Sequence, residues 1–173
     1  MGLGPGPNQD NREVKMSWQE PNAVERLEII QQAKTVAIVG VSANRARSSY
    51  FVASYLRGGD YYQVYFVNPM IDQLFGDKVY ASLADLPEAP DIVDVFRKAE
   101  DTPQVLDEAI AAGAKTIWLQ LGISNDEVAE RGTAAGLKVV MNRCLKIEHA
   151  RFRGGLHLAG FNTGVISSKR AKA

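Results

Sequence analysis

The loop after the first apolar run combines the residue types that bind phosphate. It reads Gly-Val-Ser-Ala-Asn-Arg-Ala-Arg-Ser-Ser over residues 40–49 and precedes a segment with helical spacing. Hydroxyl and amide side chains offer hydrogen bonds there, guanidinium groups supply positive charge, and the N-terminus of a helix attracts anions. The predicted phosphate site consists of Gly40, Ser42, Ala43, Asn44, Arg45, Arg47 and Ser48. The alternative is a solvated loop whose arginines pair with nearby carboxylates.

Two features of this region depart from an NAD-binding pattern. Only the first glycine of G-x-G-x-x-G is present, and Ser42 replaces the second, which lets the backbone approach a pyrophosphate closely. An NAD-binding domain also places an acid at the end of its second strand for the ribose. Here the run ending at Val67 continues with Asn68 and Pro69, and the next acid is Asp72. Asn68 either binds a base or ribose or belongs to a simple strand-ending turn.

Few groups are suited to acid–base or nucleophilic chemistry. His149 lies in a charged stretch, and we predict a surface or packing side chain there. Cys144 stands between Arg143 and Lys146, cations that would favour its thiolate and a mixed disulfide with a ligand thiol. The alternative is an inert thiol, because a free cysteine is commonly a small core residue. We predict no catalytic residues, no metal site and no self-contained catalytic constellation.

These loops must be positioned by apolar runs that alternate with segments of helical spacing. Strands are predicted at residues 35–40, 63–67, 91–96, 115–119 and 137–141, with a short extended piece at 78–81. Helices are predicted at residues 23–33, 49–57, 102–113 and 124–136, the last opened by a capping box of Ser124 and Glu127. The pattern indicates an α/β class fold, a Rossmann-like doubly wound, mostly parallel sheet of five or six strands with helices on both faces. Such sheets bind ligands at the carboxyl ends of their strands.

Composition and charge limit the functions that the chain could have. Its 173 residues fit one domain with tails, and 20 basic side chains balance 20 acidic ones, which argues against a general nucleic-acid binder. No apolar run approaches the roughly 20 residues that cross a bilayer, so we expect no membrane partner. A single cysteine excludes an internal disulfide and favours a cytoplasmic location.

The balanced charge conceals an uneven distribution along the chain. Residues 143–173 hold seven basic side chains and one acidic one, Glu148, so the preceding part is acidic. We predict a disordered leader at 1–20, a ligand-binding domain at 21–150 and a basic C-terminal extension at 151–173, partly packed on the domain. Because the basic part begins at the ligand edge, Arg143 or Lys146 is expected to help neutralise ligand phosphates.

Six segments together resemble the family of small stand-alone CoA-binding proteins, which is similar to the CoA-binding domain of the succinyl-CoA synthetase alpha subunit. They are residues 35–49, 67–69, 91–97, 111–114, 117–122 and 139–149. The most specific are Trp-Leu-Gln-Leu-Gly at 118–122 and Asn-Arg-Cys-Leu-Lys-Ile-Glu-His at 142–149. The resemblance covers about residues 21–168 and implies a Rossmann-like domain with coenzyme A lying across the strand ends.

The resemblance also implies roles for individual residues. Residues 42–48 would hold phosphates, a second group would flank or contact the adenosine, and a third would face the pantetheine arm. The last two groups are Asn68, Pro69, Phe96 and Arg97 for the adenosine, and Gln120, Leu121 and Gly122 for the arm. The synthetase subunit has a lysine shortly after its second strand, and residues 70–74 have none. Phosphate charge would then come from Arg45, Arg47 or Arg97.

The function that follows is non-catalytic binding of CoA or an acyl-CoA at the carboxyl edge of the sheet. One alternative is a subunit of an acyl-CoA ligase or acyl-transfer enzyme that a partner chain completes. Another is an NAD(P)-sensing regulator in which Arg45 and Arg47 take a 2′-phosphate. Besides the small-molecule ligand, the expected partners are a second copy of the chain or an enzyme partner.

Overall fold

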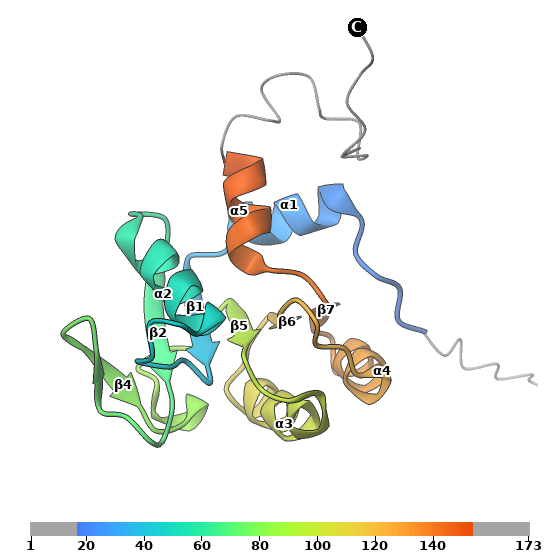
Figure 1. The fold of residues 1–173 in the computed structure, drawn as a ribbon. Helices are drawn as coiled ribbons and strands as arrows, with labels where there is room; N and C mark the ends of the chain where they lie inside the picture. Colours follow the sequence, from blue (N-terminus) through green and yellow to red (C-terminus); the bar gives the residue numbers. More distant parts are fainter. Residues whose placement is uncertain (1–16, 154–173) are drawn as a thin grey trace, which may run out of the picture.

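Seven strands form one sheet in a computed structural model that describes residues 17–153 (Figure 1). They are β1 Thr35–Val39, β2 Gln63–Val67, β3 Gln73–Leu74, β4 Asp77–Tyr80, β5 Ile92–Val95, β6 Thr116–Leu119 and β7 Lys138–Val140. Their order is β3-β4-β2-β1-β5-β6-β7, and every neighbouring pair is parallel except β3 with β4. The predicted α/β Rossmann-like class is therefore confirmed. The extended piece at 78–81 belongs to β4, and the two-residue β3 is the strand that the pattern did not indicate.

Five α-helices cover the two faces of the sheet. They are α1 Ala23–Gln32, α2 Ser48–Gly58, α3 Thr102–Ala111, α4 Asp126–Ala134 and α5 Leu145–Arg153, with short 3-10 turns at Leu83–Asp85 and Ala99–Asp101. α1, α2 and α5 pack on one face and α3 and α4 on the other (Figure 1). Asn125 caps α4, since its side chain accepts from Val128 N at 3.3 Å, so the capping box predicted at Ser124 is wrong.

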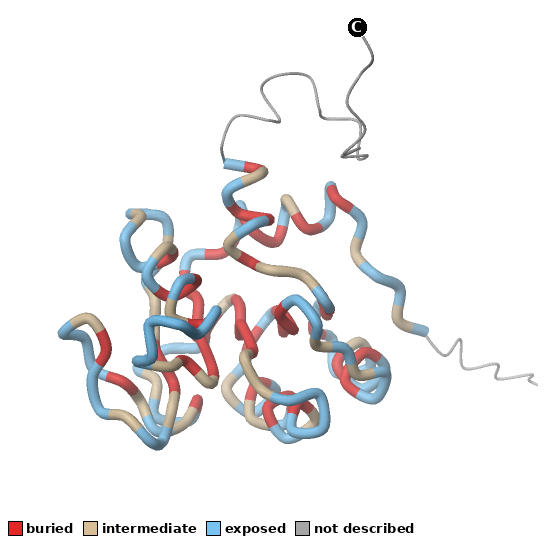
Figure 2. Tube along the Cα trace, in the orientation of Figure 1, coloured by how far each residue is buried: buried red, intermediate tan, exposed pale blue. Residues whose placement is uncertain are grey.

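The central strands are buried, and they are coloured red in Figure 2. Apolar residues pack against them from both faces of the sheet. Every residue of β1, β5 and β6 is buried, which explains why their sequences are continuous apolar runs rather than alternating ones. Asp94 in the middle of β5 is a charged exception, with 0% of its surface exposed. The parallel sheet thus forms a rigid core, and polar groups on it are confined to a few positions.

The chain changes direction across the sheet between β1 and β5. From β1 it passes through α2 to β2 on one side, and it later returns to β5 on the other side of β1. Gly40 ends β1 at this switch point with a φ of 81°, and a Cβ there would lie 2.2 Å from the carbonyl oxygen of Phe96. Only glycine fits both the backbone angle and the contact. Gly40 therefore brings the loop after β1 against the end of β5.

The ends of the described region differ from the predicted boundaries. Residues 17–20, which were assigned to the leader, lie on the domain, where Trp18 Nε1 donates to the Val139 carbonyl at 3.0 Å. Helix α5 runs across the boundary expected at residue 150. The rest of the predicted leader, residues 1–16, and residues 154–173 of the predicted extension lie outside the described residues. No helix of residues 17–153 has the length and apolarity that a bilayer crossing requires.

Candidate ligand site at the switch point of the sheet

The loop between β1 and α2 has a defined backbone and a free surface. Ser42 N donates to Ser49 Oγ at 3.1 Å, and Ala46 N donates to Asn44 Oδ1 at 2.9 Å, which hold the loop in shape. Residues 43–48 are exposed, and the loop is pale blue in Figure 2. Arg47 precedes α2 without a side-chain cap, and within residues 17–153 the N–H groups of Ser48 and Ser49 have no acceptor. This helix end can therefore donate hydrogen bonds to an anion.

A pocket of 380 Å³ opens beside this helix end, and we call it the α2 pocket. It is lined by Gly40, Ser42, Arg47, Ser48, Ser49, Phe96 and Ile123. Five of these seven residues belong to the predicted set, from the loop after β1 and the end of β5. Within the described chain no carboxylate pairs with Arg45 or Arg47. The pocket thus combines unpaired positive charge with unpaired N–H donors.

A second pocket, the α3 pocket of 260 Å³, lies on the α3 side of the same strand ends. It is lined by Val39, Val67, Pro69, Ala81, Ser82, Arg97, Asp101, Gln104, Val105 and Glu108. Valine and proline side chains supply apolar walls, whereas Gln104, Asp101 and Glu108 supply donors and acceptors. Such a mixture suits a planar heterocycle with polar edges. Phe96 lines the α2 pocket and Arg97 lines the α3 pocket, so two consecutive residues after β5 connect the pockets.

Asn68 has a structural task at the end of β2. Its Nδ2 donates to the Val41 carbonyl at 2.7 Å, and its Oδ1 accepts from Met70 N at 2.8 Å. These bonds join the turn after β2 to the loop after β1. Pro69 follows and lines the α3 pocket. Both predicted residues are at the expected edge, but the amide of Asn68 is already engaged within the chain.

Gln120 is the predicted residue whose surroundings differ most from the expectation. It follows β6, is 4% exposed, and its Nε2 donates to Asp94 Oδ1 at 2.5 Å. The other carboxylate oxygen of Asp94 has no hydrogen-bond partner among residues 17–153. Burial raises the pKa of Asp94 to about 7, although the hydrogen bond from Gln120 opposes the shift. Asp94 is the side chain here that sequence reasoning missed, and its signal was an acid inside an otherwise apolar strand.

The next two residues form an exposed turn that Asn142 fixes. Leu121 is 66% exposed, and Gly122 has a φ of 85°. Gly122 N donates to Asn142 Oδ1 at 2.7 Å, while Asn142 N donates to the Ile123 carbonyl at 3.0 Å. Asn142 itself has a φ of 54°, a left-handed conformation that asparagine tolerates. The turn predicted to face the pantetheine arm is thus anchored to the end of β7.

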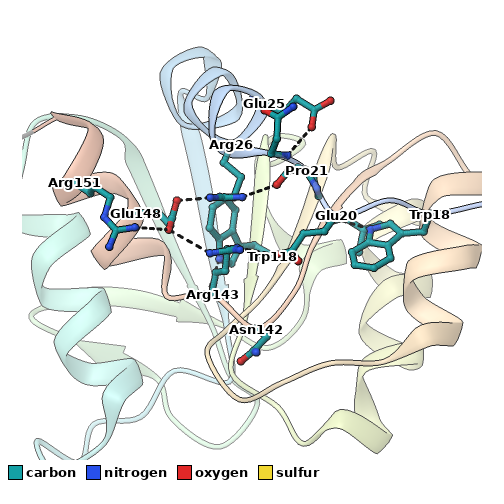
Figure 3. A network of polar contacts seen from close by, with 12 residues as sticks. Trp18, Glu20, Pro21, Glu25, Arg26, Trp118, Asn142, Arg143, Glu148 and Arg151 are labelled. Atoms are coloured by element: carbon teal, nitrogen blue, oxygen red, sulfur yellow. Dashed lines mark hydrogen bonds and ion pairs between the residues drawn. The ribbon is translucent and has the colours of Figure 1, made fainter. Parts of the chain in front are cut away.

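Arg143 does not contribute free charge to this edge. Figure 3 shows its guanidinium in a network with Glu20 and Glu148, at 2.7 Å from Glu20 Oε1 and 3.8 Å from Glu148 Oε1. Glu148 is 3% exposed and also pairs with Arg26 at 3.0 Å and Arg151 at 3.7 Å. We call these five residues the Glu148 network. Because its guanidinium is engaged by Glu20 and Glu148, Arg143 does not match the expectation that it neutralises ligand phosphates. The alternative residue, Lys146, has its Nζ 5.6 Å from the ring centre of Tyr55.

His149 and Cys144 lie on the face covered by α1, α2 and α5. His149 is fully buried, with Tyr55 Oη 3.0 Å from its Nδ1 and the rings of Tyr61 and Tyr62 packed around it. Burial lowers the pKa of His149 to about 4, so it is neutral at pH 7, and its contact with Tyr55 joins α5 to α2. Cys144 is half-buried and packs against the same core.

Comparisons with known proteins identify the family and the fold. A family model described as "CoA binding domain" matches residues 34–150. An uncharacterized protein of Bacillus subtilis (strain 168), YneT, is 36% identical over 132 residues, which are 76% of this chain and 97% of that protein. An ADP-forming acetate–CoA ligase of Methanocaldococcus jannaschii is 26% identical over 129 residues, which are 70% of this chain but 18% of the ligase.

Solved structures with similar folds include two small proteins. One, the cell-free ID.343 protein from Thermus thermophilus, has a TM-score of 0.71 and 39% identity, over 76% of this chain and 99% of its own. A hypothetical protein from Pyrococcus horikoshii OT3 has a TM-score of 0.73 and 34% identity, over 84% of this chain and 99% of its own. The match over nearly all of these small proteins shows that the fold occurs as a separate chain.

Proposed function

Because the chain belongs to the CoA-binding domain family, we propose that it binds coenzyme A or an acyl-CoA at the switch point of its sheet, without catalysis of its own. The observation that carries this proposal is the α2 pocket, where unpaired N–H groups of Ser48 and Ser49 meet Arg47. Phosphate oxygens are the chemical match for such donors, because the helix end and the guanidinium both favour negative charge.

The two adjacent pockets suit the extended, two-ended form of the ligand. Phosphates in the α2 pocket and the adenosine in the α3 pocket would place the ligand across Phe96 and Arg97. Arg97 is half-buried and has no carboxylate partner in the described part of the chain, so its charge is available to a phosphate. The exposed turn at Leu121 would then lie along the path of the pantetheine arm.

An NAD(P) ligand fits the same edge less well. Ser42 occupies the position where a second glycine would let the backbone reach a pyrophosphate, and Asn68 occupies the position of the ribose-binding acid. The Asn68 amide is bonded to Val41 and Met70, which leaves it little freedom to bind a ribose. NAD is therefore the best competitor with which to challenge the proposal.

Calorimetry with CoA, dephospho-CoA, NAD and ATP tests the proposal on the full chain. We expect CoA to bind most tightly, and dephospho-CoA to bind more weakly because it lacks the 3′-phosphate. Absent binding of CoA, or equal affinity for all four ligands, would contradict the proposal. Mass spectrometry of a ligand retained through gentle purification would identify an acyl group if one is carried.

A ligase partner is the second candidate function. It is favoured by the match to a segment of the acetate–CoA ligase, in which the similar region is 18% of a larger enzyme. In that role the chain would present CoA, in the cytoplasm, to a partner chain that holds the remaining chemistry. Copurification of a second subunit from the native source would support a ligase partner, whereas a purified homo-oligomer would favour the stand-alone binder.

A further inference from the structure

Asp94 is placed where the fold alone gives no reason for a carboxyl group. Its neighbours in β5 are Ile92, Val93 and Val95, and all four residues are buried. No cation pairs with Asp94 within residues 17–153, and its Oδ2 is enclosed without a hydrogen-bond partner. An apolar residue at this position would avoid the cost of burying the group. A side chain kept at such a cost is a candidate for a role in the site above it.

The partner of Asp94 indicates what that role is. Gln120 Nε2 donates to Asp94 Oδ1 at 2.5 Å, so the amide nitrogen of Gln120 is turned toward the sheet. The amide oxygen, Oε1, is the end of the amide that Asp94 does not bind, and no hydrogen bond to it is found among residues 17–153. It is not one of the enclosed unpartnered atoms of this region, so solvent reaches it. The carboxyl group therefore fixes which end of the Gln120 amide remains available.

Strand register places this free oxygen beside the ligand edge. Val95 of β5 pairs with Leu119 of β6, so the following residues, Phe96 and Gln120, are neighbours on the same side of the sheet. In agreement with this register, Gln120 N donates a hydrogen bond to the Val95 carbonyl at 3.4 Å. Phe96 lines the α2 pocket. Gln120 thus stands next to a wall of that pocket, one residue before the exposed turn at Leu121.

We propose that Asp94 is a positioning residue that turns Gln120 so that its Oε1 accepts a hydrogen bond from an amide N–H of the pantetheine arm. This inference rests on the proposed CoA function and adds to it a specific recognition of the arm. A hydrogen bond that only the arm can make adds to the affinity for CoA and adds nothing for a ligand without the arm, so the contact discriminates between the two.

The test compares CoA with adenosine 3′,5′-bisphosphate, which lacks the arm, on the full chain. Gln120→Met keeps the side-chain length and removes the acceptor, and Asp94→Val removes the group that orients it. Each should weaken CoA binding about tenfold and change the affinity for the bisphosphate less than about twofold. Asp94→Asn keeps an oxygen that can accept from Gln120, so it should restore CoA binding to within about threefold of the wild type.

The double variant Asp94→Val with Gln120→Met separates positioning from a general effect on the fold. If Asp94 acts through Gln120, the double variant binds CoA as weakly as Gln120→Met alone. Additive losses, or equal weakening of both ligands, would overturn the inference. Asp91→Asn, at the opposite end of β5, is the matched control and should leave both affinities unchanged.

Two further results separate the possible failures. If the wild type binds the bisphosphate and CoA but Gln120→Met binds CoA normally, the inference is wrong while the proposed function stands. If the wild type binds neither ligand, the proposed function itself is wrong. Should Asp94→Val fail to fold, Gln120→Met still tests the contact between Gln120 and the arm, and normal CoA binding by that variant would overturn the inference.

Discussion

Asp94 and Glu148 are both buried on the face of the sheet covered by α1, α2 and α5, but only Glu148 has cationic partners. Glu148 is bonded to Arg26 and approached by Arg143 and Arg151 (Figure 3). Asp94 has one neutral partner, Gln120, and an oxygen with none in the described chain. Buried charge with its counter-charge ties elements together, whereas buried charge without it is more often kept for a site.

The arginines also fall into two groups, those that pair with a carboxylate and those that do not. Arg26 is 7% exposed and holds Glu148 and the Pro21 carbonyl, so it joins α1 to α5 and to the segment before α1. Arg45 and Arg47 are exposed and pair with no carboxylate among residues 17–153. The charges of the Glu148 network therefore stabilise the fold, whereas the charges of the loop after β1 remain available to a ligand. Substitutions should separate the two effects.

The largest effect is expected from Glu148→Ala. It leaves Arg26 buried without its partner, which should lower the free energy of unfolding by about 3–5 kcal/mol. Affinity of the folded protein for CoA should stay within about twofold, because the network does not line either pocket. Urea unfolding and calorimetry measure the two quantities. Glu127→Ala, which breaks the exposed pair with Arg131, is the control and should cost less than about 1 kcal/mol.

Asp94→Asn should instead stabilise the protein, and increasingly so as the pH rises. The folded pKa of Asp94, about 7, is above its usual value of 3.8, so the folded state binds its proton more tightly. The associated stability is present below pH 4 and is lost as the pH rises through 7. The advantage of the variant over the wild type should grow to the order of 4 kcal/mol at pH 8. A difference in unfolding free energy that does not vary between pH 4 and pH 8 would contradict this.

Gly40→Ala tests the contact that shapes the carboxyl edge. The new Cβ would lie 2.2 Å from the Phe96 carbonyl oxygen, at a φ of 81°, so we expect a loss of about 3 kcal/mol in stability together with weaker CoA binding. Gly76→Ala is the matched control, since its φ is 80° but no atom lies within 4 Å. It should cost only the backbone strain, about 1 kcal/mol. Equal losses in the two variants, measured by urea unfolding, would show that the contact with Phe96 is unimportant.

The smallest effect on stability is expected at the two exposed arginines of the loop after β1, where the effect on CoA affinity should be large. Replacing Arg45 and Arg47 together by glutamine should weaken CoA binding roughly thirtyfold, about 2 kcal/mol. Unfolding free energy should change by less than about 0.5 kcal/mol, because both side chains are exposed. Arg57→Gln, which removes the exposed pair with Asp77 at the other end of α2, is the control for charge. CoA affinity that falls equally in Arg57→Gln would point to a general charge effect.

The parts of the fold that the sequence predicted are those with a local signal. The apolar runs indicated the central strands, because a strand that is buried on both faces is apolar at consecutive positions. The glycine at residue 40 indicated the loop after β1, because a backbone with a positive φ favours glycine. Helix α5 was not predicted, since about half of its residues are charged or histidine and two of its four buried side chains are polar. Those two, Glu148 and His149, have their hydrogen-bond partners on α1 and α2.

The sequence indicated the loop of the candidate site, but not the contacts between distant residues beside that loop. Residues 40–48 were predicted because their types and order indicate phosphate binding, and four of them line the α2 pocket. The contact of Asp94 with Gln120 joins residues 26 positions apart, and that of Trp18 with Val139 joins residues 121 positions apart. Strand order and the packing of the N-terminal segment bring such pairs together, and a single sequence specifies neither. For the same reason the engagement of Arg143 with Glu20 was not foreseen.

The most direct test of the CoA site is a titration of ¹⁵N-labelled protein with CoA, followed by backbone amide shifts. We predict that the largest changes fall at residues 40–49, 96–97 and 120–122, around the α2 and α3 pockets, with little change at Glu148. A third pocket, of 330 Å³, lies at the amino ends of the strands and is lined by Asp91, Lys115 and Lys138 among others. Changes centred on that pocket, with the loop after β1 unaffected, would contradict the account.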